Sequence, residues 1–431
     1  MSVINHIIDA NKAGQQAGIF AVCSAQPLVL QAALLQAKAR STPLLIESTA
    51  NQVNQFGGYT GMTPKDFIQF VTSMANDLGV DESQLVFGGD HLGPVVWCKQ
   101  NADTAMALAE ELIADYVKAG FTKIHLDTSM ACLDDDMPLT DEIIAERAAR
   151  LCAIAEAHCA PSQQLCYVIG TEVPAPGGVS EMEQELAVTP VSAIEHTLAC
   201  HQAAFERANL GIDVWQKVIA LVVQPGVEFD NSQVHLFEPE ATTAQSQFIR
   251  HYPRLVFEAH STDYQLASGY QALVQQHFAI LKVGPQLTFA LREALFALSH
   301  IENVLCAPEQ RSNLRQTCFE QMRENPKYWQ GFYADSDALK WQLGFSFSDR
   351  IRYYWPSLQG AVERLLTNLS CAIPLPLLSQ YLPNQYNAVL AGELAPTARA
   401  LVLHKITEVL NAYADACQMP TLNRQLERMT S

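Results

Sequence analysis

The sequence predicts a (β/α)₈ barrel followed by a helical extension. Short β-rich runs alternate eight times with longer helical patterns between about residues 18 and 290, which matches such a barrel in both count and length. Several runs are almost continuously apolar, as expected of parallel strands that helices cover. A doubly wound sheet is the alternative, but no Gly-x-Gly-x-x-Gly turn follows the first strand and no Gly-Lys-Ser/Thr loop occurs. We therefore expect the barrel.

The predicted strands follow the apolar runs along the chain. They are Gly18–Ser24, Pro43–Ser48, Leu85–Asp90, Lys123–Thr128, Leu165–Glu172, Val218–Gln224, Leu255–His260 and Phe278–Val283. Amphipathic stretches separate them, such as a helix over Asp103–Ala119 that follows Asn101 and stops at Gly120.

After about residue 291 the alternation stops, and the sequence predicts helices over Leu291–Leu305, Ala361–Leu369 and Thr397–Tyr413. No low-complexity linker separates this part from the barrel. We expect a barrel over residues 1–295 and a helical extension over residues 296–431 that packs on it.

The composition excludes several classes of protein. The 431 residues include 27 Lys and Arg against 45 Asp and Glu, a net charge of −18 that disfavours binding to nucleic acid or to anionic membranes. No apolar run reaches the roughly 18 residues that cross a bilayer. The chain starts without a basic, apolar signal segment. The eleven cysteines form no Cys-x-x-Cys pair, which favours reduced thiols in a cytoplasmic protein over disulfides or a structural zinc site.

Ionisable side chains collect where the predicted strands end, and the carboxyl ends of barrel strands meet at one mouth. Carboxylates and imidazoles that converge there suit a divalent metal ion, zinc or a similar one, which would polarise a carbonyl or hydroxyl group. The alternative is a purely structural polar network. The candidate metal ligands are His91, Glu172 and His260. For either histidine alone, a hydrogen-bonded loop residue is the better interpretation.

Two carboxylates are candidates for proton transfer. Asp90 precedes His91 and would act as a general acid or base, or else cap the glycine-rich turn Gly88–Gly93. Glu258 would act as a base, although backbone amides would satisfy a carboxylate at this position equally well.

Six further residues are candidates for binding a small sugar or sugar phosphate: Glu47, His125, Asp127, Lys282, Arg350 and Arg352. His125 and Asp127 share one strand face and either line the site or form a buried polar layer. Lys282 raises the less favoured alternative of a Schiff base. The two arginines lie among aromatic residues, where they would hold a phosphate or sugar, or form a subunit contact.

Long motifs lie along nearly the whole chain. They are Ala21–Ala25, Asn51–Met62, Gly88–Pro94, Gly170–Pro174, Val223–Asp230, Phe257–Gln265, Lys282–Pro285 and Leu287–Ala294. These motifs resemble those of the Z-type subunit of class II D-tagatose-1,6-bisphosphate aldolase, from bacterial galactitol and N-acetylgalactosamine catabolism. Within that family, the likeness is closer to the subunit of the amino-sugar pathway.

The resemblance implies a (β/α)₈ fold and a role beside a separate catalytic Y-type subunit. Z-type subunits are described as inactive alone and as supporting the activity and stability of Y, in a chaperone-like way. A tagatose-6-phosphate kinase activity, also ascribed to the family, is not expected because no nucleotide-phosphate loop is present.

The sequence departs from the catalytic class II aldolases at two places. Those enzymes take zinc histidines from the third, sixth and seventh strands. Here His91 and His260 match the third and seventh, but the sixth strand ends at Gln224, and an amide is a poor zinc ligand. The glycine-rich phosphate loop after the seventh strand is replaced by Ser261–Tyr264.

Two functions remain open. The first is a stabilising subunit that has lost aldol cleavage. The second is a metal-dependent ketose or keturonate epimerase, with His91, His260 and either Glu172 or Glu228 around a cation, and with Asp90 or Glu258 moving a proton. The retained ionisable residues favour the second function, because buried charges are costly, whereas the resemblance favours the first.

Overall fold

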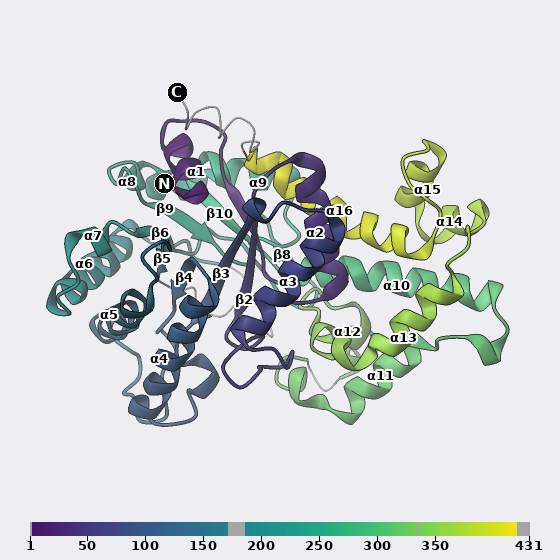
Figure 1. Ribbon diagram of the computed structural model, residues 1–431, viewed down its shortest axis with the longest axis horizontal. Helices are drawn as coiled ribbons and strands as arrows, with labels where there is room; N and C mark the ends of the chain where they lie inside the picture. Colours follow the sequence, from purple (N-terminus) through teal and green to yellow (C-terminus); the bar gives the residue numbers. More distant parts are fainter. Residues whose placement is uncertain (1, 171–185, 334–335, 420–431) are drawn as a thin grey trace.

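Eight parallel strands close into a barrel in the computed structural model, which describes residues 2–170, 186–333 and 336–419. Around the barrel the strands follow the order β1-β10-β9-β6-β5-β4-β3-β2 (Figure 1). Their bounds are β1 Ile19–Val22, β2 Leu44–Thr49, β3 Leu85–Leu92, β4 Lys123–Leu126, β5 Cys166–Ile169, β6 Val218–Val222, β9 Val256–Ala259 and β10 Phe278–Val283. The predicted barrel is confirmed, and each of the eight predicted strands overlaps one of these, although β2 and β3 end one and two residues later than predicted.

Helices cover the outside of the barrel, and a small hairpin of β7 (Glu228–Phe229) and β8 (Val234–His235) follows β6. The helices before the last barrel strand are α1 Val3–Lys12, α2 Pro27–Arg40, α3 Pro64–Leu78, α4 Ala102–Ala119, α5 Asp141–His158, α6 Val191–Arg207, α7 Ile212–Trp215, α8 Thr243–Ile249 and α9 Ala267–Gln275.

Helix α4 illustrates how local sequence sets these boundaries. The Asn101 side chain accepts a hydrogen bond from the Thr104 N–H, and Gly120 ends the helix with a φ of 113°. An asparagine cap and a left-handed glycine are common helix-boundary signals. The helix predicted over Asp103–Ala119 is confirmed.

The chain after β10 is helical. Its helices are α10 Pro285–Leu305, α11 Leu314–Glu324, α12 Leu339–Phe345, α13 Trp355–Asn368, α14 Leu375–Tyr381, α15 Pro383–Leu390 and α16 Ala398–Cys417. They lie beside the barrel (Figure 1), and α10, α13 and α16 correspond to the three predicted helices. Because α10 runs across residue 295, the proposed division of the chain stays a prediction.

Many contacts join the extension to the barrel, and two illustrate them. Helix α16 returns to the barrel wall, where the Gly18 N–H donates to the Cys417 carbonyl over 2.8 Å. Arg292 of α10 and Asp349, just before the 3₁₀ turn η6 (Arg350–Tyr354), form a buried ion pair with Nε and Oδ1 3.0 Å apart. Moving Arg292 and Asp349 apart would be costly, since each charge would then be buried without a partner.

All eleven cysteines lie in the described chain, and each is a free thiol in the structure. In the same part of the chain, no helix has both the length and the apolar character required to traverse a bilayer.

Candidate functional site at the barrel mouth

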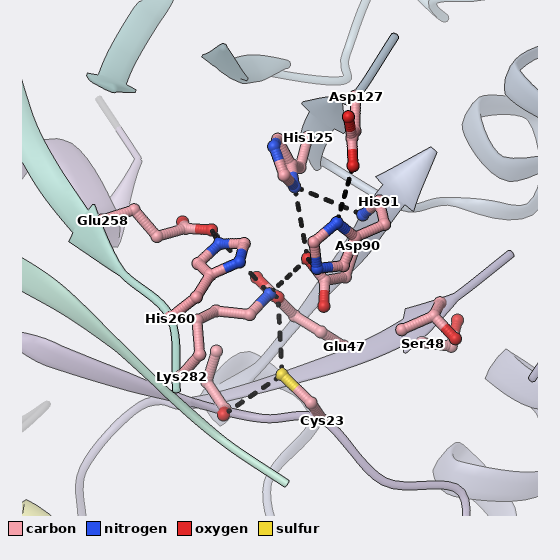
Figure 2. Close-up of polar contacts among 12 residues, drawn as sticks. Cys23, Glu47, Ser48, Asp90, His91, His125, Asp127, Glu258, His260 and Lys282 are labelled. Carbon is pink, nitrogen blue, oxygen red and sulfur yellow. Dashed lines mark hydrogen bonds and ion pairs between the residues drawn. The ribbon is translucent and has the colours of Figure 1, made fainter. Parts of the chain in front are cut away.

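The barrel brings most of the predicted site residues together at the carboxyl ends of its strands (Figure 2). Glu47 lies on β2, Asp90 and His91 on β3, His125 on β4 and Lys282 on β10. Asp127 follows β4, Glu258 lies on β9 and His260 follows it. Parallel strands with matching register place residues from distant parts of the chain at one level.

The deeper part of this cluster is a network of buried ion pairs. The Lys123 Nζ lies 2.7 Å from Glu47 Oε1 and 2.6 Å from Glu258 Oε2, and all three side chains have 0% exposure. The Lys282 ammonium pairs with Glu47, lies 2.7 Å from Asp90 Oδ1 and lies 3.8 Å from Glu258 Oε1. Lysines therefore satisfy the carboxylates, rather than the backbone amides considered above.

Charge pairing fixes the protonation states of this network. Burial would raise the pKa of Glu258, but Lys123, Lys282 and His260 hold that pKa well below its ordinary value. Burial would lower the pKa of Lys282, but Asp90, Cys23 and the two glutamates hold it well above its ordinary value. A charged, fully paired ammonium is a poor nucleophile, so the geometry disfavours the Schiff-base alternative for Lys282.

A glycine makes room for the network. Gly88 lies between Glu47 and Lys123 in the strand register. A Cβ atom at this position would lie 2.8 Å from both Cγ and Oε1 of Glu47. The side chains of Glu47 and Lys123 therefore meet across a strand position that only glycine fills without a clash.

Three imidazole rings lie above the ion pairs. The ring centroids of His91, His125 and His260 are 4.9 to 5.3 Å apart, and Figure 2 shows the rings facing one another. The sequence places His91 and His260 on the third and seventh barrel strands, and the structure adds His125 from the fourth. The sixth barrel strand, β6, supplies no histidine. Gln224 follows it and accepts hydrogen bonds from the Gly226 and Val227 N–H groups.

His260 presents an unpaired nitrogen to this space. Its Nε2 lies 3.0 Å from Glu258 Oε1, and because that carboxylate is ionised, Nε2 carries the hydrogen and donates it. Burial lowers the pKa of His260 to about 3, so the ring is neutral near pH 7. Nδ1 then holds a lone pair, and it has no hydrogen-bond partner within the residues that the structure describes.

His91 has the same kind of support from Asp127, whose Oδ2 lies 2.7 Å from His91 Nδ1. Burial would raise the pKa of Asp127, but the hydrogen bond and charge of His91 hold it well below its ordinary value. Asp127 is therefore an acceptor. Burial would lower the pKa of His91, but Asp90 and Asp127 together raise it, and His91 Nε2 lies 3.8 Å from Asp90 Oδ1. The backbone of His91 is strained at a φ of 48°, which side chains rarely adopt.

His125 has both ring nitrogens engaged. Its Nδ1 accepts from the His91 N–H over 3.2 Å, so Nε2 carries the hydrogen and donates to the Gly170 carbonyl over 2.8 Å. Asp90 Oδ1 also lies 3.3 Å from Nδ1. We infer that His125 orients His91 and Asp90, so its predicted role in substrate binding stays a prediction.

The chemistry of these donors fits a divalent metal ion. One donor atom from each of Asp90, His91, His125 and His260 lies within 4.8 Å of the others. His91 and His260 each have one nitrogen bound to a carboxylate, which is how metal-binding histidines are usually oriented. The pairs above involve four carboxylates and two ammonium groups, so a divalent cation would balance the charge. Glu172, the predicted third ligand, lies outside the described residues.

The predicted arginines lie in the extension. Arg350 packs with its guanidinium carbon 3.2 Å from the centroid of the Phe332 ring, in the interior of the extension. Arg352 lines a cavity of about 270 Å³ between the extension and the barrel, which Cys23 at the end of β1 also lines. The Cys23 thiol donates to Glu47 Oε2 over 3.8 Å, so the cavity adjoins the cluster.

That cavity is mostly apolar with a few polar groups. Trp355 lines it and is buried, and its indole N–H has no hydrogen-bond partner in the described parts of the chain. The arrangement suits a small ligand with hydrogen-bond acceptors. Arg352 thus remains a candidate for binding substrate, whereas the contacts of Arg350 are those of a packing residue.

A family model described as "D-tagatose-1,6-bisphosphate aldolase subunit GatZ/KbaZ-like" matches residues 4–418. The chain belongs to this family. The resemblance inferred from the motifs is therefore confirmed. A solved structure from Sinorhizobium meliloti 1021, of a protein named a probable tagatose 6 phosphate kinase, is 45% identical to this GatZ/KbaZ-like chain. It has a TM-score of 0.86 and covers 93% of this chain and 100% of its own.

Two aldolase structures match more distantly. The fructose-bisphosphate aldolase of Campylobacter jejuni is 16% identical with a TM-score of 0.45, covering 86% of this chain and 93% of its own. The YdjI aldolase of Escherichia coli K12 is 12% identical with a TM-score of 0.38, covering 85% and 94%. Likeness this low says nothing about the site of the GatZ/KbaZ-like chain.

The sequence interpretation missed Lys123, which the structure places in the buried ion-pair network. It begins β4 and shares an inward face with His125 and Asp127, because side chains alternate along a strand. A lysine at the first position of an otherwise apolar strand, in phase with two other ionisable residues, is the signal that would have found it.

Proposed function

We propose that this protein is the stabilising, non-catalytic component of a D-tagatose-1,6-bisphosphate aldolase and supports a separate catalytic Y-type subunit. The family match over residues 4–418 carries the proposal. Its setting would be D-tagatose 6-phosphate breakdown in galactitol or N-acetylgalactosamine catabolism, in the cytoplasm. The kinase activity named for the Sinorhizobium meliloti relative is not included, since the sequence has no Gly-Lys-Ser/Thr loop.

Two features of the mouth support a loss of aldol cleavage. The sixth strand supplies no histidine, and the amide oxygen of Gln224 is occupied by backbone N–H groups. Glu258, the predicted base, has 0% exposure and is neutralised by Lys123. A carboxylate held this way cannot readily take a proton from a substrate.

Co-expression with a Y-type catalytic subunit tests this proposal. We expect the soluble yield and the aldolase activity of Y to rise several-fold with this chain, and to stay low with an unrelated (β/α)₈ protein expressed at the same level. The variant H91A should support Y as well as the wild type does, because a stabilising role does not use the mouth. Equal yield and activity with and without this chain would refute the proposal.

A second function is favoured by one observation, the neutral and unpaired Nδ1 of His260 opposite His91. As this second function, we propose that the protein acts on its own as a metal-dependent ketose or keturonate epimerase. Asp90, His91 and His260 would hold the metal ion, which would polarise the sugar carbonyl. Arg352 would bind the distal part of a sugar or sugar phosphate in the adjoining cavity.

A Mn²⁺ titration tests the metal site directly. Binding is measured as the decrease in the electron-paramagnetic resonance signal of free Mn²⁺. We expect the wild type to bind one ion at the mouth and H91A or H260A to bind it at least about tenfold more weakly, because each loses a ligand. H158A is the matched control, since His158 is exposed at the end of α5 and its Nδ1 lies 3.0 Å from the Ile154 carbonyl oxygen, away from the mouth. Unchanged affinity in H91A and H260A, with no epimerisation of ketoses by the wild type, would exclude the second function.

A further inference from the structure

A second group of metal-binding side chains lies on the outer wall of the barrel, away from the mouth cluster. Glu142 and Asp141 lie in the first turn of α5, and His196 and Cys200 lie on the neighbouring helix α6. Residues four apart on a helix share one face, so His196 and Cys200 both point to the same side. The two helices thus bring a carboxylate, an imidazole and a thiol together.

The distances between these donor atoms are those of ligands around one ion. Cys200 Sγ lies 3.6 Å from His196 Nε2 and 3.8 Å from Glu142 Oε1. His196 Nε2 lies 3.9 Å from Glu142 Oε1. Tetrahedral zinc with its usual bonds to sulfur, nitrogen and oxygen separates its ligands by about 3.4 to 3.6 Å. Shifts of a few tenths of an ångström would therefore complete the geometry.

The surroundings leave the cluster available to a cation. No lysine or arginine in the described chain forms an ion pair with Asp141 or Glu142, and the Asp141 Oδ2 lies 3.8 Å from His196 Nε2. The His196 side chain is 59% exposed, so an ion can enter from solvent. The contacts within the cluster are weak without an ion, because a thiol is a poor donor over 3.8 Å.

We propose that Glu142, His196 and Cys200 bind a zinc ion that clips α5 to α6, with Asp141 or a water molecule as the fourth ligand. On binding, the Cys200 S–H bond breaks, its proton passes to solvent and the thiolate sulfur bonds to the metal. A borderline-soft cation with tetrahedral preference suits a ligand set of one sulfur, one nitrogen and one oxygen. The site is independent of the function proposed for the mouth.

Cobalt substitution tests this site because Co²⁺ reports thiolate ligation through a near-ultraviolet charge-transfer band. We expect one equivalent of Co²⁺ to produce the band in the full-length protein and Zn²⁺ to remove it by displacement. C200S should lose the band while keeping the far-ultraviolet circular dichroism of the wild type. C23S is the matched control, since Cys23 also lies near carboxylates, and it should keep the band.

Zinc affinity, measured by competition with a chromophoric chelator, gives an independent readout. H196A should weaken zinc binding by roughly tenfold or more, since one of three protein ligands is lost. Zinc should also raise the Tm of the wild type by more than it raises that of C200S, because the variant loses the stabilisation by the ion at this site. Absence of the band in the wild type, or its survival in C200S, would overturn the proposal.

Discussion

Replacing Lys123 by methionine is expected to lower the free energy of unfolding by about 3 to 5 kcal/mol. Methionine has nearly the length of lysine but no charge, so Glu47 and Glu258 each lose an ammonium group within 2.7 Å. Lys282 is the remaining cation in the ion pairs described here, and it lies 3.8 Å from Glu258. A buried carboxylate without close compensation is costly, and urea unfolding at pH 7 measures that cost.

Two further variants isolate the charge effect. K340M removes an ammonium group from an ion pair whose side chains are 81% and 98% exposed, and we expect it to change the unfolding free energy by at most roughly 0.5 kcal/mol. The double variant K123M/E258Q should recover part of the loss, because the uncompensated carboxylate is then gone. If K123M unfolds at the same urea concentration as the wild type, the buried network contributes nothing to stability.

The barrel was predictable because its strands bury both faces. Runs such as Val218–Val223 are almost wholly apolar and carry a strong signal regardless of their neighbours. The mouth was predictable for a related reason, since closing a parallel barrel forces Asp90, His91 and His260 to one end. Neither prediction required knowledge of which residues touch.

The pairing of charges was beyond the sequence. Lys123 begins its strand rather than ending it, so a search of strand ends passes over it. Its partners Glu47 and Glu258 come from β2 and β9, and only the strand register sets them at the same level. The orientation of Arg350 depends in the same way on its stacking with Phe332, which the local sequence does not encode.

The proposed zinc site shows a different limit. A search for Cys-x-x-Cys spacing finds nothing, yet His196 and Cys200 have the four-residue spacing of ligands on one helix face. The third ligand, Glu142, comes from another helix and depends on how α5 and α6 pack. A single helix therefore holds two of the three ligands, and the fold supplies the third.

Replacing Gly93 by alanine is expected to lower the free energy of unfolding by about 2 to 4 kcal/mol. A Cβ atom there would lie 1.7 Å from the carbonyl oxygen of Asp127, a backbone atom that cannot move alone. The φ of Gly93 is 174°, an extended value, so the expected loss is purely steric. To relieve the clash, the chain after β3 must move away from the chain after β4. These two segments are joined by a hydrogen bond from the Asp127 N–H to the Leu92 carbonyl over 3.0 Å.

G360A is the matched control for this substitution. Gly360 lies inside α13 with nothing within 4 Å of its added Cβ, so alanine should stabilise the protein by roughly 0.5 to 1 kcal/mol. In G93A, displacement of Asp127 should also release His91 Nδ1, so Mn²⁺ binding at the mouth should weaken along with stability, whereas G360A should leave it unchanged. If G93A were as stable as the wild type, the chain after β3 and the chain after β4 would separate at no cost. If G93A were destabilised but kept its Mn²⁺ affinity, Asp127 would not position His91.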